Sequence, residues 1–426
     1  MPVLRAGAAT TVITPAAGLE LEGYLREGPS VGVLDDLTCQ AVVFDDGATR
    51  LAVAAADLIG MTRPLRERVC AGLDLPPEQV MLTATHTHCG PANLASPGHE
   101  DLLDLLAERI IQAITAAMSA LQPVRLIAGT AVAEGVAANR RDPAGPVDHE
   151  ATFLALVSAD GGMVATIVNF ACHPTILDAQ TRSYSADFPG AARQAIEGLC
   201  GGQCVYLQGA AGDINPVRTE PSAAETRRTG AILGAAVARE VLLSLRSLDR
   251  AQVINPSTES PRTVTVLARG RLIQPAPLRA RLTEVAVEPR NHPPLAAIRA
   301  AHAAATNPAR RTELALEEYI ATGTGFGSFD FPGRSPALPV QAFRLGAGLS
   351  VAGLPGEPFT ATGRQIRAAA AGTVLLAGYA NQAAGYLPPR HEFERSGLEV
   401  GCSTHAPGTA ELLADAAAGL VRSLAP

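Results

Sequence analysis

Two histidines with one residue between them are the first residues in this sequence whose types and spacing could do chemistry. His86 and His88 lie in the run THTHCGP, residues 85–91. Strand-forming residues precede this run and Gly90-Pro91 ends it, so we expect the histidines at the carboxyl end of a strand. Alternate strand residues face the same side, so the two imidazoles would emerge together. They can share a metal ion, or one can bind it while the other handles protons; two surface histidines in a polar loop are the structural alternative.

A third histidine occupies an equivalent place further along the chain. Residues 163–168 form an apolar, strand-like run, and His173 follows it immediately before Pro174. A lone histidine is more often a hydrogen-bonded structural residue than a ligand. Its position nevertheless matches that of His86, and open α/β sheets gather ligands at the carboxyl ends of their strands. The sequence therefore favours one site that contains all three histidines.

Further polar residues follow strand-like runs in the second half of the chain. Asp213 and Asn215 lie in the turn GAAGDINP, residues 209–216, which is not a P-loop because no Lys-Ser/Thr pair follows its glycines. Glu357 opens a predicted helix, where a carboxylate can simply complement the helix dipole. Tyr386 lies in a Gly-rich and Pro-rich segment after another predicted strand. Each feature has an ordinary structural explanation alone, but their repetition at strand ends indicates a shared site.

Five of these runs, in this order, resemble the neutral/alkaline (non-lysosomal) ceramidase family. They are THTHCGP at 85–91, NFACH at 169–173, GAAGDINP at 209–216, LPGE at 354–357 and GYLP at 385–388. Each motif is weak alone, and the specificity lies in their order. The resemblance extends over most of the chain, from residue 7 to residue 399.

The resemblance implies a zinc site with one ion per chain. The implied ligands are His86, His173, Glu357 and Tyr386. Imidazole and carboxylate groups are ordinary zinc donors, and the chain has no CxxC pair to offer instead. Zinc can lower the pKa of a bound water to roughly 7, which supplies hydroxide at neutral pH.

The resemblance also implies roles for residues around the metal. His88 is expected to act as general base for the water and then as acid for the leaving amine. Arg140 matches an arginine that contacts the polar head of the substrate, a task that suits a fixed guanidinium. Asp187 is expected to accept a hydrogen bond from a ligand histidine, with a helix cap as the alternative. Asp57, at a strand end, and Asp213 are further candidates for supporting the ligands.

Two positions depart from the family pattern. Asn215 stands where the ceramidases carry a serine near the scissile amide, and Leu398 replaces a tyrosine before Glu399. We retain Asn215 and Tyr386 among the catalytic candidates. Because the metal set is intact while the residues facing the substrate differ, we expect a smaller, soluble amide rather than ceramide.

Strand-like and helix-like segments alternate along the chain, which predicts an α/β layered fold with a central mixed β-sheet flanked by helices and the site at strand carboxyl ends. Helices are expected at 63–73, 99–121, 191–199, 223–245, 311–321, 358–371 and 408–424. The candidate ligands span most of the sequence, so we expect residues 1–426 to form one catalytic domain without the immunoglobulin-like C-terminal domain of full-length ceramidases. Residues 255–339 are the exception: we expect a strand at 263–268 and an irregular insert, with the loop 323–329 as pocket wall or lid.

Composition excludes several classes of partner. A formal net charge of −7 argues against nucleic acid and anionic membrane surfaces. The chain lacks an 18-residue apolar run and a basic-then-apolar start, so we expect no membrane span and a cytoplasmic protein. The seven cysteines are scattered, which favours reduced thiols, and Cys89 and Cys172 are expected to be buried. Homo-oligomerisation is left open.

The sequence thus predicts a zinc-dependent hydrolase that cleaves a C–N amide bond in a small molecule. One alternative is hydrolysis of an ester or lactone, or a metal-assisted lyase step, at the same site. Another is a non-catalytic ligand-binding protein, which would require a degraded metal set.

Overall fold

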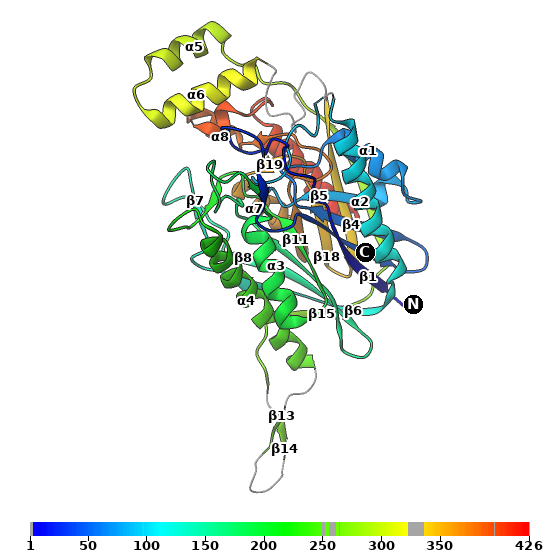
Figure 1. Ribbon diagram of the computed structural model, residues 1–426. Helices are drawn as coiled ribbons and strands as arrows, with labels where there is room; N and C mark the ends of the chain where they lie inside the picture. The colour runs from blue at the N-terminus through cyan, green and yellow to red at the C-terminus, as the bar shows by residue number, and fades with distance from the viewer. Residues whose placement is uncertain are drawn as a thin grey trace.

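Two stacked β-sheets covered by helices on both outer faces form the body of the protein (Figure 1). The computed structural model describes residues 3–96, 98–248, 252–254, 261–263, 265–322, 336–395 and 397–425. Both sheets mix parallel and antiparallel strands. The predicted α/β layered fold with a mixed sheet is confirmed, with the addition of a second, smaller sheet.

The larger sheet has nine strands. Across the sheet their order is β11 (Gln203–Gln208), β9 (Met163–Phe170), β8 (Glu150–Ser158), β6 (Gln122–Val132), β1 (Arg5–Val12), β3 (Thr38–Asp45), β4 (Arg50–Ala56) and β5 (Val80–Ala84), with β15 (Arg271–Ile273) also paired to β6. The pairs β4–β5 and β9–β11 are parallel. The carboxyl ends of β5 and β9 lead into the two histidine motifs.

The smaller sheet packs face to face against the larger one. It consists of β16 (Arg279–Ala286), β17 (Ala337–Gly346), β18 (Leu349–Gly353) and β20 (Thr373–Ala377), and β18 is parallel to β20. Alternate residues of its strands face opposite sides. Phe343 and Val351 therefore join Leu154 in the core between the sheets, while Ala342 and Ala352 pack on the helices outside.

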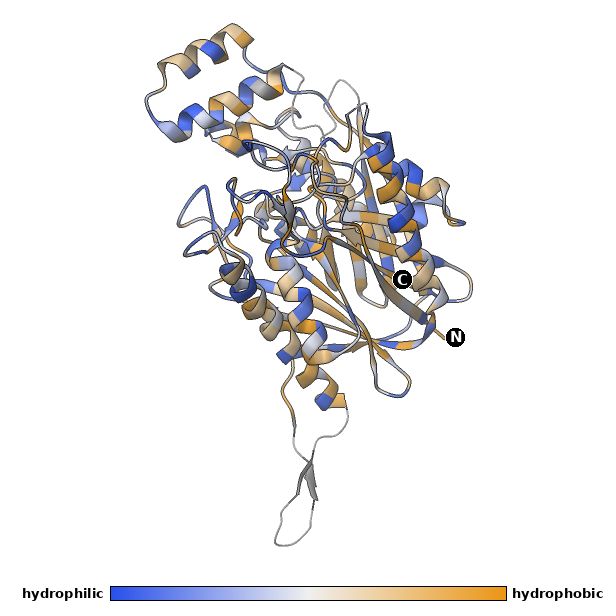
Figure 2. Cartoon of the chain, in the orientation of Figure 1, coloured by the Kyte–Doolittle hydropathy of each residue, from blue (hydrophilic) through white to orange (hydrophobic). Residues whose placement is uncertain are grey.

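Helices cover the outer face of each sheet. On the larger sheet lie α1 (Arg63–Ala71), α2 (Glu100–Ser119), α3 (Asp187–Cys200) and α4 (Ala223–Leu248); on the smaller sheet lie α7 (Thr360–Ala368) and α9 (Thr409–Ser423). Figure 2 shows hydrophobic residues gathered on the strands and hydrophilic residues on the outward turns of the helices. These helices lie where they were predicted, with ends shifted by a few residues. No helix in the described ranges is both long and apolar enough to cross a membrane.

Residues 255–339 are more ordered than predicted where the structure describes them. They contribute β15, β16 and a helical hairpin of α5 (Leu295–Ala304) and α6 (Pro308–Ala321), which leans on the short helix α8 (Leu398–Gly401) (Figure 1). The predicted strand at 263–268 is wrong, because 265–268 are not in a strand. Few side chains of the hairpin are buried, so its sequence has a weak hydrophobic period. The predicted loop at 323–329 lies outside the described residues.

Short elements complete the fold. They are the strands β2 (Gly32–Val33), β7 (Ala137–Asn139), β10 (Ser183–Tyr184), β12 (Ile214–Pro216), β13 (Gln252–Ile254), β14 (Pro261–Thr263), β19 (Glu357–Pro358) and β21 (Tyr386–Leu387), and the 3₁₀ helices Pro77–Gln79 and Arg390–Glu394. The strands pair as β2–β10, β7–β12, β13–β14 and β19–β21.

Buried polar side chains fasten the two sheets together at the carboxyl ends of their strands. The Asn169 side chain, on β9, donates to the carbonyl of Leu376 and accepts from the N–H of the same residue, both at 2.8 Å. Thr83, on β5, donates to the Gly378 carbonyl at 2.7 Å. These bonds bring the loops after β5, β9, β11, β18 and β20 into one region.

Candidate metal centre and its cleft

His86 is held rigidly at the end of β5. Its backbone lies in the left-handed region (φ 68°), and its N–H donates to the Leu58 carbonyl at 2.9 Å. The imidazole Nδ1 lies 2.5 Å from the Ile59 carbonyl, and the ring stacks on Tyr379 with 4.0 Å between ring centroids. A carbonyl oxygen can only accept, so Nδ1 carries a proton, and in that tautomer Nε2 presents a lone pair.

His173 is oriented in the same way from the end of β9. Its Nδ1 lies 2.7 Å from the carbonyl of Ala211, in the glycine-rich turn after β11. Burial, followed by the charge of Arg140, lowers the pKa of His173 to about 4, so the ring is neutral at pH 7. Its Nε2 therefore also presents a lone pair, 3.2 Å from Nε2 of His86.

A carboxylate completes this group. The Oε2 atom of Glu357 lies 3.4 Å from Nε2 of His86 and 3.3 Å from Nε2 of His173. It is buried and has no hydrogen-bond donor in the described part of the chain. Burial opposes ionisation of Glu357, whereas positive charge beside it at His86 and His173 lowers the pKa of its carboxyl below the usual range.

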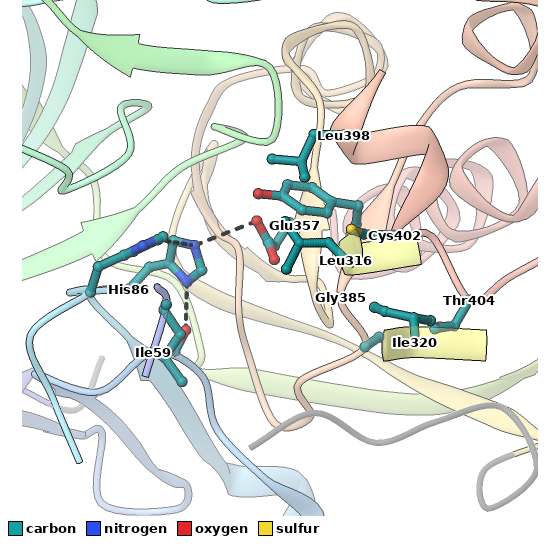
Figure 3. Close-up of a pocket in the computed structure, with 13 residues that line it drawn as sticks. Ile59, His86, Leu316, Ile320, Glu357, Gly385, Leu398, Cys402 and Thr404 are labelled. Atoms are coloured by element: carbon teal, nitrogen blue, oxygen red, sulfur yellow. Dashed lines mark hydrogen bonds and ion pairs between the residues drawn. The ribbon is translucent and has the colours of Figure 1, made fainter. Parts of the chain in front are cut away.

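Nε2 of His86, Nε2 of His173 and Oε2 of Glu357 thus converge as electron-pair donors, and in these tautomers none of the three atoms carries a hydrogen that it could donate to another. Such an arrangement is unfavourable unless a cation lies among the donors. Imidazole nitrogens and a carboxylate oxygen are donors that zinc prefers, so the residues present fit the predicted ion. In Figure 3 the side chains of His86 and Glu357 point toward one another, and the Ile59 carbonyl holds the far side of the histidine.

His88 belongs to the same group. Its Nε2 is 3.4 Å from Nε2 of His86, and His86, His88 and His173 each offer a nitrogen within 4.8 Å of the others. Burial holds the pKa of His88 well below its usual value, and a proton on His86 or His173 would lower it further. Its Nδ1 is buried and has no hydrogen-bond partner among the described residues. The predicted role of His88 as base rather than ligand stays a prediction.

Tyr386 and Arg140 stand beside the carboxylate. Tyr386 pairs with Glu357 across β19 and β21, and its ring lies 6.3 Å from that of His173. Arg140 donates from Nη2 to the Tyr386 hydroxyl at 3.0 Å and from Nη1 to Oδ1 of Asn215 at 3.2 Å. Its Nε forms an ion pair with Glu399 at 2.8 Å. Arg140 is therefore fixed at the edge of the candidate metal centre.

The donors open into a cleft with two parts, which we call the inner limb and the outer limb. The inner limb encloses about 80 Å³ directly over the donors, and its walls are mostly apolar: Ile59, Leu316, Ile320, Ala384, Leu398 and Cys402 (Figure 3). The outer limb encloses about 610 Å³, and its walls are more polar: Tyr24, Arg140, Thr175, Asn215, Arg218, Thr312 and Glu313. His88, Tyr386 and Leu398 line both limbs. The positions where the sequence departs from the ceramidases thus face the cleft.

The expectation for Asp187 is wrong. Its carboxylate accepts from the backbone N–H groups of Leu177 (3.0 Å) and Phe188 at the start of α3, not from a histidine. The backbone carbonyls of Ile59 and Ala211 accept hydrogen bonds from the ligand histidines instead. These carbonyls, which follow β4 and β11, lie nearer to the imidazole Nδ1 atoms than any carboxylate does.

Asp57 and Asp213 support the ligand loops without touching a ligand. Asp57 accepts from the Thr85 hydroxyl at 3.0 Å and forms a buried ion pair with Arg193 (2.7 Å), which fixes the residue before His86. Asp213 accepts from the N–H (2.7 Å) and hydroxyl of Thr360 at the start of α7. It thereby fastens the glycine-rich turn to that helix.

Sequence reasoning missed several residues at the site. Tyr379 stacks on His86, and Gly23 packs against the His88 ring. The ring of Tyr24 lies 4.9 Å from that of His88. Gly23 and Tyr24 come from a loop between β1 and β2, and nothing in their spacing pointed to the histidines. The expected burial of Cys89 and Cys172 is confirmed, and all seven cysteines are free.

Comparison with known proteins agrees with the fold. No family model matches the chain. The neutral ceramidase of Pseudomonas aeruginosa is 26% identical over 457 aligned residues, which cover 92% of this chain and 68% of that protein. The crystal structure of neutral ceramidase from Pseudomonas aeruginosa has a TM-score of 0.74 at 22% identity, and a structure titled "Ceramidase complexed with C2" has 0.72 at 23%. Both matches cover 100% of this chain and 76% of the other. The chain is thus similar in sequence to neutral ceramidase over most of its length, and it shares the fold of the solved ceramidase structures.

Proposed function

We propose that the protein is a zinc-dependent hydrolase that cleaves a C–N amide bond. The observation that carries this proposal is the convergence of two Nε2 lone pairs and one carboxylate oxygen within 3.4 Å of one another, at the floor of a cleft. The relationship to neutral ceramidase, whose name describes an enzyme that acts on an amide, supports the reaction class.

His86, His173 and Glu357 would hold one zinc ion per chain, with the Tyr386 hydroxyl as the fourth proposed donor. When bound, zinc supplies Lewis acidity toward a carbonyl group and lowers the pKa of a water. The backbone carbonyls behind the two imidazoles keep Nε2 unprotonated, which is the form that binds a metal.

The remaining residues position the substrate and move protons. His88 lines both limbs, so it can take a proton from water on one side of the amide and return it to the amine nitrogen. Arg140 is fixed by Glu399, Gly212 and Tyr386, so its guanidinium can bind a polar group of the substrate without reorganising. The apolar wall at Leu316 and Leu398 shields the site from bulk solvent while leaving room for the attacking water.

We further propose that the substrate is smaller than ceramide. Leu398 and Asn215 face the cleft at the two positions that depart from the ceramidase pattern. Within the described residues the inner limb encloses only about 80 Å³, which suits a short apolar arm.

A substrate screen tests both the reaction and the size. Zinc-loaded protein is incubated with amides, esters and lactones that carry acyl groups from two to sixteen carbons, and released amine and acid are quantified. We expect amide cleavage with short acyl groups, lost in the His86→Ala/Glu357→Ala variant. Turnover of esters or lactones without any amide cleavage would assign the site to the alternative reaction. Binding without turnover of any class would assign it to a binding protein.

A further inference from the structure

The charges of the outer limb are paired, with one exception. Arg140 is paired with Glu399 at 2.8 Å, and Glu313 is paired with Arg310 at 2.8 Å. Arg218 lines the same limb and has no carboxylate within 4.0 Å among the described residues. Among the described residues the limb therefore carries one positive charge without an ion-pair partner, on a chain whose net charge is −7.

In the described part of the chain, Arg218 is held in place through one nitrogen of its guanidinium group. Its Nη1 donates to the carbonyls of Thr175 (2.8 Å) and Ile176 (2.7 Å), in the segment that follows His173. The described residues offer no hydrogen bond to Nη2 or Nε. Asp187, the acid that acts on Arg218 at longer range, is buried and directs its oxygens to backbone N–H groups. A guanidinium fixed on one edge presents its other donors to a ligand with little loss of entropy.

The two limbs of the cleft thus differ in chemistry: one is apolar and the other carries a positive charge. Apolar side chains such as Ile320 and Leu398 wall the inner limb, and the positive charge of Arg218 stands on the wall of the outer limb. An amide that lies across the donors places one arm in each limb. The arm in the inner limb should be apolar, and the arm in the outer limb should complement a guanidinium.

We propose that Arg218 selects substrates that carry an anionic group on one side of the scissile amide and an apolar group on the other. This inference rests on the proposed amide hydrolysis and narrows its substrate class. N-acyl amino acids with a short aliphatic acyl group are the simplest members. Carboxylate and phosphate both pair with a guanidinium, so both are compared in the test.

The kinetic test compares three substrates that share a hexanoyl group: hexanoylglycine, hexanoylethanolamine and hexanoyl phosphoethanolamine. We expect wild-type protein to cleave an anionic substrate with a kcat/KM at least about tenfold above that of the neutral ethanolamide, mainly through KM. Arg218→Gln should lower kcat/KM for the anionic substrate at least about tenfold relative to that for the ethanolamide, whereas Arg218→Lys should keep part of the preference. The matched control Arg125→Gln removes an exposed arginine of β6, outside both limbs, and should behave as wild type.

The comparison of hexanoylglycine with hexanoyl phosphoethanolamine decides which anion is preferred. A preference for hexanoylglycine over the phosphoethanolamide assigns Arg218 to a carboxylate, and the reverse assigns it to a phosphate; either supports the inference. Equal rates for the charged and neutral substrates would overturn it. An equal loss of both rates in Arg218→Gln would also overturn it, because Arg218 would then only brace the Thr175–Ile176 segment.

A binding measurement keeps the inference testable if no amide is cleaved. Hexanesulfonylglycine and hexanesulfonylethanolamine carry a sulfonyl group in place of the scissile carbonyl, and calorimetry gives their affinities for zinc-loaded protein. Tighter binding of the glycine compound, lost in Arg218→Gln, would uphold the anion site even if the proposed hydrolysis failed. Equal affinities would overturn the anion site and leave the proposed hydrolysis standing.

Discussion

The Nε2 atoms of His86 and His173 face one another at 3.2 Å, although 87 positions separate these residues in the chain. Both Nδ1 atoms are committed to backbone carbonyls, so two lone pairs meet in a buried space beside a carboxylate. This relationship is the physical reason to expect a cation, and the first predictions depend on it.

Metal content is the most direct prediction. Purified protein should contain about one zinc per chain, and His86→Ala/Glu357→Ala should contain almost none, because two of the converging donors are gone. Elemental analysis after dialysis measures the ion, and circular dichroism checks that the variant is folded. An unchanged zinc content in a folded variant would show that the ion binds elsewhere.

His88 should be separable from metal binding. His88→Ala is expected to retain zinc and to lose about 10²–10⁴-fold in kcat, the usual contribution of a general base. Metal analysis and steady-state kinetics on one preparation make the comparison, with His302→Ala on α5 as a control that should match wild type. Loss of zinc from His88→Ala would instead make His88 a ligand, which its 3.4 Å distance from His86 allows.

Gly23 should control the position of His88. A Cβ at Gly23 would lie 2.5 Å from the His88 ring, and the backbone there has φ +94°. Gly18 has φ +109° but no neighbour within 4 Å of its Cβ position, so Gly18→Ala carries the same backbone cost of about 1–2 kcal/mol without the clash. We expect Gly23→Ala to lower kcat/KM at least about tenfold while Gly18→Ala leaves it unchanged. Equal activities in the two variants would show that His88 adjusts freely.

The buried pair of Asp57 and Arg193 should matter more for stability than a surface pair. Asp57→Asn leaves the Arg193 charge buried without its partner, which costs about 3–5 kcal/mol in free energy of unfolding. Arg228→Gln breaks an ion pair whose arginine is 62% exposed, and should cost less than about 1 kcal/mol. Urea denaturation of both variants gives the two values, and similar losses would contradict this ranking.

Asp187 should make stability depend on pH. Burial, opposed by the N–H groups of Leu177 and Phe188, raises its pKa in the folded protein to about 7. Between about pH 4 and pH 7 the folded state then holds a proton that the unfolded state has lost, so this group makes stability fall as pH rises, by at most about 1.4 kcal/mol per pH unit. Above pH 7 the contribution levels off. Asp187→Asn should flatten the curve of unfolding free energy over this window, and an unchanged slope would contradict the prediction.

Much of the site could be predicted because its residues follow strands that are obvious in the sequence. The ends of β5, β9, β18 and β20 are marked by Gly or Pro after apolar runs, and the motif order linked them. The sequence could not indicate that helix α6 would line the cleft, since few of its side chains are buried.

Other features depend on geometry that no local pattern encodes. The carbonyls of Ile59 and Ala211 support the imidazoles only because His86 adopts a left-handed backbone and the turn after β11 reaches His173. Alternation in β17, β18 and β20 predicts strands but not membership of a second sheet, which is fixed by contacts such as Asn169 with Leu376. The predicted contact of Asp187 with a ligand histidine was wrong for the same reason: the groups that bond to its carboxylate are backbone N–H groups of its own loop and helix.

The division of the donors between two sheets has a consequence for biosynthesis. His86 and His173 leave the ribosome early, but Glu357 follows His173 by 184 residues, or about 10–40 s at ordinary rates of synthesis. Until the smaller sheet is made and docks, the nascent chain offers a metal only the histidines. Capture of the ion should therefore be one of the last events in maturation, and chains stalled before residue 357 should leave the ribosome without it.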